Sequence, residues 1–325
     1  MSAILTWLHQ AIVFGAFIML AAVGELLTEK AGNLNLGTPG TMCVGAAAGI
    51  AGLDIYKTSG GSNTFLLIII ALSSAFAAAA FMGFIYSLFT TTLRINQNVV
   101  GLVLTIFGVG LAKFISATVV HIPSSGNVRF DDAYAVFNAK IPWLSSSLGA
   151  VSDLLFNYGF MFYLTLLIIV GISLFLYRTR TGLSLRSVGE NPGTADAAGI
   201  NVIKYKYFAS CIGSGLTGLA GIFCVMEFKS GAWSTTDISS IRAFGWLAVA
   251  LVIFAMWKPL NLIWGSLVFG VFYWAYQHLF KIPTDLTQML PYIVTIIVLI
   301  VVSFRSKKEN QGPASLGLSY FREDR

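Results

Sequence analysis

Residues 65–89 read FLLIIIALSSAFAAAAFMGFIYSLF, a run without a single charged side chain. A helix of about 20 apolar residues can cross the hydrocarbon core of a bilayer, where only helices and closed barrels satisfy their backbone hydrogen bonds. Stretches with almost no charge also occupy 99–120, 158–177 and 292–304. Charged residues make up 10% of the 325 residues, against about 25% in soluble domains. The chain is therefore predicted to be a polytopic membrane protein.

Hydropathy extends this prediction along the chain. The expected fold is all-α, a single transmembrane helix bundle over 1–325 with about 8–10 spans. The segment 36–53 is rich in Gly and Ala, so a broken or re-entrant helix is an alternative to a full crossing there. The candidate spans lie near 5–23, 36–53, 65–91, 97–120, 157–177, 207–228, 243–257, 260–280 and 287–304.

The distribution of Lys and Arg predicts the orientation of the bundle. The loop 178–206 and the tail 305–325 together hold ten of the 20 basic residues. Both are therefore expected on the cytoplasmic side, and an even number of spans between them agrees with a shared side. The connection 121–156 carries more acidic residues and several Pro and Ser, which favours a folded external loop.

Several kinds of chemistry have no support in the sequence. No GxxxxGK[ST] phosphate loop or nucleophile motif occurs, and the three His residues are isolated, so neither ATP hydrolysis, other catalysis nor a metal site is expected in this chain. The net charge of +6 reflects membrane topology, and no nucleic-acid-binding motif accompanies it. The string GSGLTGLAG at 213–221 contains GxGxxG, but small residues inside an apolar span favour close helix packing.

The polar segment 185–202 contrasts with its apolar surroundings. Asn191 suits an N-cap, Pro192 the first helical position, and Gly199 a left-handed helix end. The pattern predicts a helix of about two turns between them, with small Ala residues that another surface can approach closely. An ordinary solvated loop is the alternative.

Four blocks in order resemble the ABC-importer permeases of the branched-chain amino acid, ribose and nucleoside group, in particular the nucleoside-type, simple-sugar-like subgroup. They are GELLTEKAGNLNLGTPGTMCVGA (24–46), RTRTGLSLRSVGENPGTADAAGINV (178–202), GWLAVALVIFAMWKPL (245–260) and MLPYIVTIIVL (289–299). The likeness runs from about residue 11 to 305. Two departures concern the substrate: Phe254-Ala255-Met256-Trp257 replaces Phe-Gly-Arg/Lys-Trp, and Pro39 stands where Glu is more usual.

The resemblance implies a multi-pass protein of the cytoplasmic membrane with a cytoplasmic C-terminus. It also implies a cytoplasmic coupling helix that docks on a separate ABC ATPase, which binds ATP and Mg²⁺; this chain itself holds no cofactor. A second permease subunit, related but different, and an external substrate-binding lipoprotein complete the expected complex, with 121–156 helping to dock the lipoprotein. The coupling residues are Arg186, Gly189, Glu190, Asn191, Asp196, Ala197, Ala198 and Gly199.

Polar groups at membrane depth are candidates for the substrate pathway. Asn33 and Asn35 lie in a Gly-flanked segment that suits a broken helix, although helix–helix hydrogen bonding explains them equally well. Glu25 is a further candidate, with a charge cluster at a helix end as the alternative. Asn96–Asn98 read as a helix cap. A nucleobase needs an aromatic face, for which Phe107, Phe244 and Trp246 are candidates.

The sequence thus predicts a non-enzymatic permease subunit of an ATP-driven importer, with a nucleoside as the expected substrate. A pentose or other simple sugar is the alternative within the same family. An ion-driven secondary transporter and an assembly scaffold are the alternatives from other classes. The first of these needs paired intramembrane carboxylates or a cation site, neither of which is evident in the sequence.

Overall fold

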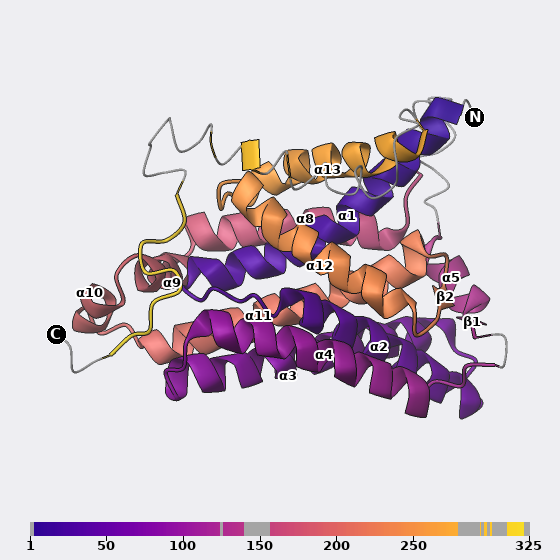
Figure 1. Ribbon diagram of the computed structural model, residues 1–325, viewed down its shortest axis with the longest axis horizontal. Helices are drawn as coiled ribbons and strands as arrows, with labels where there is room; N and C mark the ends of the chain where they lie inside the picture. Colours follow the sequence, from indigo (N-terminus) through magenta and orange to yellow (C-terminus); the bar gives the residue numbers. More distant parts are fainter. Residues whose placement is uncertain are drawn as a thin grey trace.

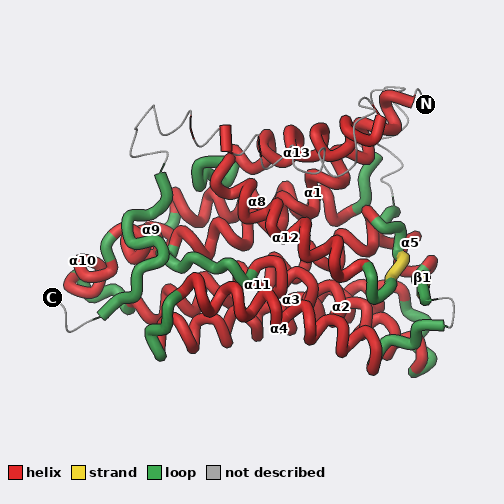
Figure 2. Tube along the Cα trace, in the orientation of Figure 1, coloured by secondary structure: helices red, strands yellow, loops and turns green. Residues whose placement is uncertain are grey.

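The computed structural model describes residues 3–123, 126–139, 157–278, 293, 296–297, 300 and 311–321. The described part is almost entirely helical, as Figure 2 shows, which confirms the all-α prediction. The long helices are α1 (Ala3–Lys30), α2 (Thr38–Thr58), α3 (Thr64–Ser87), α4 (Gln97–Thr118), α8 (Phe160–Arg178), α11 (Val202–Phe223), α12 (Asp237–Phe254) and α13 (Asn261–His278). Shorter elements are α5 (Asp131–Phe137), α9 (Arg180–Glu190), α10 (Pro192–Ala197), the π-helical turns η1 (Leu88–Thr92) and η2 (Cys224–Phe228), and strands β1 (Val128–Arg129) and β2 (Ala232–Trp233).

The long helices run lengthwise between two ends of the molecule (Figure 1). One end, the α10 end, holds α9, α10 and residues 311–321. The opposite end, the α5 end, holds α5 and the short β1–β2 ladder, in which Val128 pairs with Trp233. The loop 178–206 and the described part of the C-terminal tail, 311–321, therefore lie together, as the charge pattern predicts, and the described part of the connection 121–156 lies at the other end.

Within the described residues, six helices are long and apolar enough to cross a membrane, namely α1, α3, α4, α8, α11 and α12. Of the nine predicted spans, the one at 36–53 is the continuous helix α2, which begins at Thr38 after an irregular segment and is almost wholly buried. The span at 260–280 corresponds to α13, which is apolar over the stretch Asn261–Trp274 within the described residues. The prediction at 287–304 lies almost entirely outside the described residues.

Helices α1 and α11 form the centre of the bundle, and α3, α4 and α8 lie further out. In the most apolar stretch of each helix, 89% of the residues are buried in α1 and 78% in the segment that contains α11. The corresponding shares in the three outer helices are 22–39%. Large apolar side chains project from those outer helices; Phe81, Ile106 and Leu167 are 61%, 75% and 68% exposed. Such surfaces are rare on soluble monomers and suit contact with lipid.

The glycines of α11 allow the close packing expected of them. A Cβ built on Gly218 would collide with the side chain of Ala79 in α3, and one on Gly213 would collide with the carbonyl of Gly24 in α1. The string GSGLTGLAG is therefore a packing surface that α1, α2 and α3 approach, which confirms the interpretation based on small residues.

At the α5 end, polar contacts join segments far apart in sequence. Lys57, at the end of α2, forms an ion pair of 2.8 Å with Asp132 of α5, and this hydrogen bond lowers the pKa of the exposed Asp132 carboxyl. The buried Asp54 accepts hydrogen bonds from the backbone N–H of His121 and contacts its ring nitrogen. These contacts fasten the described part of the 121–156 connection to α2.

Candidate functional site

The α10 end carries most of the predicted coupling residues, and its local structure follows from simple capping rules. The Asn191 side chain accepts a hydrogen bond of 3.0 Å from the Thr194 backbone N–H. Pro192 occupies the first turn of α10, and Gly199 has φ of +83°, a conformation that favours glycine. The predicted short helix with these caps is confirmed.

Helix α10 presents an outer surface of small residues. Ala195 is buried, 3% exposed, in a cluster with Val188 and Val202. Ala197, Ala198 and Gly199 are exposed instead. The helix is therefore anchored on one side and free on the other to meet a second surface.

Helix α9 connects α10 to the centre of the bundle through Gly189. A Cβ built there would collide with the carbonyl oxygen of Lys30, at the end of α1. Arg186 lies over the ring of Tyr177, 4.8 Å from its centroid, and the Glu190 carboxylate accepts from the backbone N–H of Ala314. The predicted coupling segment thus contacts both α1 and the C-terminal tail.

The tail 311–321 packs across the α10 end and joins three separate segments. The Ser315 backbone N–H donates to the carbonyl of Gly189 at 3.0 Å. The Gly317 N–H donates to the carbonyl of Gly32, and the Tyr320 hydroxyl donates to Asp196 of α10 at 2.9 Å. The tail therefore holds α9 and α10 against the segment that follows α1.

Residues 31–37 break the helix between α1 and α2, as predicted. The Asn33 amide donates to the backbone oxygen of Lys206 at 3.2 Å and to the Ser210 hydroxyl at 2.9 Å, both in α11. Its own side-chain oxygen is buried with no partner among the described residues. Asn35 accepts from the Gly37 N–H at 2.9 Å. Asn33 therefore hydrogen-bonds the break between α1 and α2 to α11, and its role toward a substrate stays a prediction.

Glu25 and Glu29 lie one turn apart on α1 and are each 1% exposed. Glu25 accepts a hydrogen bond from the Thr38 hydroxyl, and Glu29 accepts one from the Trp257 indole N–H. One oxygen of Glu25 has no partner among the described residues. Both carboxyl groups lie in the last turns of α1, at the helix end that the charge-cluster alternative expected, but they are buried beside the helix break.

Gln97, expected from the sequence to be part of a helix cap, connects distant segments instead. Asn96 caps α4 as expected, accepting from the Asn98 N–H at 2.9 Å. The neighbouring Gln97 is 2% exposed; its oxygen accepts from the Leu34 N–H at 2.7 Å and its amide donates to the Leu318 carbonyl at 3.1 Å. It therefore links the helix break to the tail. Nothing local in the sequence distinguishes it from its neighbours.

The three aromatic candidates do not come together in one site. Phe107 is 51% exposed on the outer face of α4. Phe244 is buried among Phe14, Phe17, Phe228 and Tyr273. Trp246 is partly buried on α12. Of the six predicted substrate residues, only Glu25, Asn33 and Asn35 share one region. Within the described residues, no three His, Cys, Asp or Glu side chains are placed to hold a metal ion.

Comparison with known proteins adds to this geometry. Residues 7–299 match the family described as branched-chain amino acid transport system, permease component. A protein of Haloferax volcanii named as a putative glucose ABC transporter permease, TsgC13, is 32% identical, over 81% of this chain and 74% of its own length.

Two relatives named for nucleosides align over a larger share of the chain. The nucleoside ABC transporter permease NupC of Lactococcus lactis is 29% identical, over 89% of each chain. The guanosine ABC transporter permease NupQ of Bacillus subtilis is also 29% identical, again over 89% of each.

Proposed function

Because this chain belongs to the permease-component family of branched-chain amino acid transport systems, we propose that it is the transmembrane permease subunit of an ATP-driven importer of nucleosides. The observation that carries the coupling half of this proposal is α10, a capped helix with an exposed face of small residues at the end where the basic loops gather. The substrate half rests on the end-to-end similarity to NupC and NupQ.

The outer surface of α10 supports docking of a separate ATPase subunit, which binds ATP and Mg²⁺. Beside the exposed Ala198 lies a cavity of about 370 Å³ between α9 and α10, lined in part by Leu183 and Ala195. A largely apolar groove next to a narrow, small-residue helix accepts a side chain from an opposing surface.

A movement of α10 has a direct route into the bundle. Gly189 touches the end of α1. Asn33, just after that end, is hydrogen-bonded to α11, and Glu25 lies in the last turns of α1 itself. Packed helices move as rigid units, so displacement of α9 and α10 displaces α1 against α11. Asn33, Asn35 and Glu25 are then the polar groups at the moving contact, where we place the substrate pathway.

A simple sugar is the second candidate substrate, favoured by the 32% identity to TsgC13. A nucleoside contains a pentose, so hydroxyl-binding groups serve both classes. The nucleobase adds a flat aromatic surface that needs stacking. Phe107, Phe244 and Trp246 are the candidates for that stacking surface.

The remaining parts of the proposed complex follow from the two ends of the molecule. The α10 end faces the cytoplasm together with the C-terminal tail, because both carry the excess of Lys and Arg. The α5 end faces outward and docks an external substrate-binding lipoprotein. A second, related permease subunit completes the transmembrane part.

The test is uptake of labelled uridine, adenosine and ribose by cells with and without this chain, its partner subunits being present in both. Loss of nucleoside uptake alone supports the nucleoside proposal, and loss of ribose uptake alone moves the substrate to the sugar class. In proteoliposomes, uptake that requires enclosed ATP distinguishes an importer of this kind from a transporter driven by an ion gradient.

A further inference from the structure

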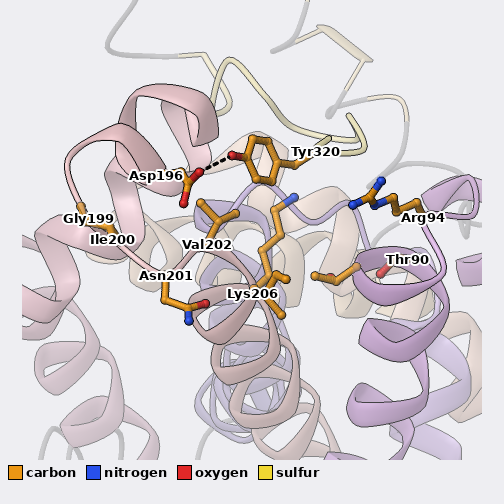
Figure 3. A pocket seen from close by; sticks show the side chains of 11 residues that line it. Thr90, Arg94, Asp196, Gly199, Ile200, Asn201, Val202, Lys206 and Tyr320 are labelled. Atoms are coloured by element: carbon orange, nitrogen blue, oxygen red, sulfur yellow. Dashed lines mark hydrogen bonds between the residues drawn. The ribbon is translucent and has the colours of Figure 1, made fainter. Parts of the chain in front are cut away.

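A second cavity at the α10 end is separate from the groove beside α10 and from the helix break. It measures about 350 Å³ and lies between η1, the beginning of α11 and the tail (Figure 3). Its lining includes Thr91, Arg94, Asp196, Asn201, Lys206 and Tyr320. No role in coupling or transport described above uses this space.

Lys206 is the central feature of the cavity. The residue is 3% exposed, and Figure 3 shows its side chain running along the cavity toward the tail. Its ammonium group has no hydrogen bond or ion pair with any described residue. Removing an ammonium from bulk water is costly unless an anion or several acceptors replace the lost hydration. Among the described residues Lys206 thus has no counter-charge, and the cavity is a space in which an anion could supply one.

Arg94 brings a second positive charge to the same space. Its backbone φ is +59°, a left-handed conformation uncommon outside Gly, Asn and Asp. The guanidinium lies over the ring of Phe321, 4.9 Å from the centroid, and forms no ion pair among the described residues. The Thr91 hydroxyl nearby is also without a partner in the described part of the chain.

The one acidic side chain in the lining, Asp196, offsets only one of the two positive charges. The Asp196 carboxylate accepts the hydrogen bond of Tyr320 at 2.9 Å, and it lies across the cavity from Arg94 in Figure 3. The first turn of α11 also borders the cavity through Val202 and Ile203, and a helix N-terminus favours an anion. The balance of charge facing the cavity is positive.

We propose that this cavity binds the phosphate group of a phosphate ester, held by the Lys206 ammonium, the Arg94 guanidinium and the Thr91 hydroxyl. A guanidinium presents paired donors that match two phosphate oxygens, and an ammonium supplies a compact charge to the third. The cavity has room for the esterified group as well. The inference concerns a site beside α10 and does not depend on which substrate the chain transports.

Two sources supply this chemistry, a soluble phosphomonoester and the headgroup of an anionic phospholipid. Either one, bound between η1, α11 and the tail, braces the segments that hold α10. Binding therefore stabilises the α10 end and provides a means to adjust coupling from the cytoplasm or from the inner leaflet.

The experiment measures the thermal unfolding midpoint of the full chain in nanodiscs. Discs of phosphatidylcholine receive glycerol 3-phosphate in increasing concentration, and a parallel series without additive replaces part of the lipid by phosphatidylglycerol. The expected rise at saturation is about 2–4 °C. Lys206→Gln and Arg94→Gln each remove one of the two charges. Each is expected to raise the ligand concentration that gives half of the maximal rise by at least about tenfold.

Lys204→Gln is the matched control. Lys204 is exposed near the same end of α11 and does not line the cavity, so this substitution removes the same charge outside the site. Lys206→Arg tests for rescue by a retained charge, and Arg94→Gln covers the case in which Lys206→Gln does not fold. In either series the wild type and Lys204→Gln should respond, and the two charge-removing variants should respond more weakly. A response only in the glycerol 3-phosphate series identifies a soluble ligand, and a response only in the phosphatidylglycerol series identifies a lipid headgroup. Equal responses in wild type and both charge-removing variants, or no response in either series, overturn the proposal.

Discussion

Removing the side-chain cap of α10 is expected to weaken the interaction of this chain with its ATPase. Asn191→Ala deletes the acceptor of the 3.0 Å hydrogen bond from the Thr194 N–H. Loss of an Asn cap costs about 1 kcal/mol of helix stability. Helix α10 has 6 residues, too few to be stable by itself. The lost free energy therefore shifts the equilibrium of this segment from the helical toward the unwound form.

The size of the effect follows from that balance. A change of about 1 kcal/mol alters an equilibrium about fivefold, and a ligand that binds only one form loses affinity in proportion to the fraction of that form. We expect the apparent affinity for the ATPase to fall by up to about fivefold. The assay titrates the ATPase against the permease in nanodiscs and measures ATP-driven uridine uptake in proteoliposomes at low and at saturating ATPase. Uptake should recover at saturation.

Two variants separate this explanation from general destabilisation. Asn63→Ala removes the equivalent cap of α3, where the side chain accepts from the Phe65 N–H at 3.0 Å, and should leave ATPase affinity unchanged. Asn191→Asp retains a capping oxygen and should bind as the wild type does. Wild-type affinity in Asn191→Ala, or an equal loss in Asn63→Ala, would refute the reasoning.

Three further predictions concern packing, docking and the substrate pathway. Gly218→Leu should destabilise the bundle by about 1–3 kcal/mol or more through overpacking and lower the amount of protein in the membrane, whereas Gly110→Leu, with nothing within 4 Å of an added Cβ, should not; equal membrane levels would contradict this. Ala197→Trp should abolish transport and ATPase stimulation with normal membrane insertion, and unchanged transport would exclude this face of α10 from docking. Asn33→Leu should raise the KM for uridine about tenfold if the unpartnered oxygen of Asn33 binds substrate; a lower unfolding midpoint with unchanged KM would leave Asn33 only a structural role, through its bonds to Lys206 and Ser210.

The parts of the structure that were predicted from sequence follow local rules. The caps of α10 depend on Asn191, Pro192 and Gly199, all within nine positions, and each residue type has one strong preference there. The break at 31–37 likewise follows from nearby glycines and asparagines. Apolar length alone was sufficient for most of the long helices. It was less informative for α2, where Gly and Ala suggested a broken segment and burial among neighbours produced a continuous helix.

The parts that were missed depend on contacts between distant residues. The bond from Ser315 to Gly189 joins positions 126 residues apart. The tail has no hydrophobic periodicity from which this packing could be predicted. Gln97 resembles its neighbours in sequence, yet it alone of the three is buried. The aromatic candidates failed to converge for a similar reason, since Phe is abundant here and composition does not tell a lipid-facing ring such as Phe107 from a core ring such as Phe244.

The tail contacts also have a consequence for how the protein is made. Residues 311–321 follow every described helix along the chain, so the ribosome delivers them after those helices. Until they emerge, Gly189 lacks its bond from Ser315, and Asp196 lacks its bond from Tyr320. We expect a chain interrupted after α13 to enter the membrane with α10 unfastened. With α10 as the proposed docking helix, we expect such an unfinished subunit to bind the ATPase more weakly than the complete chain does.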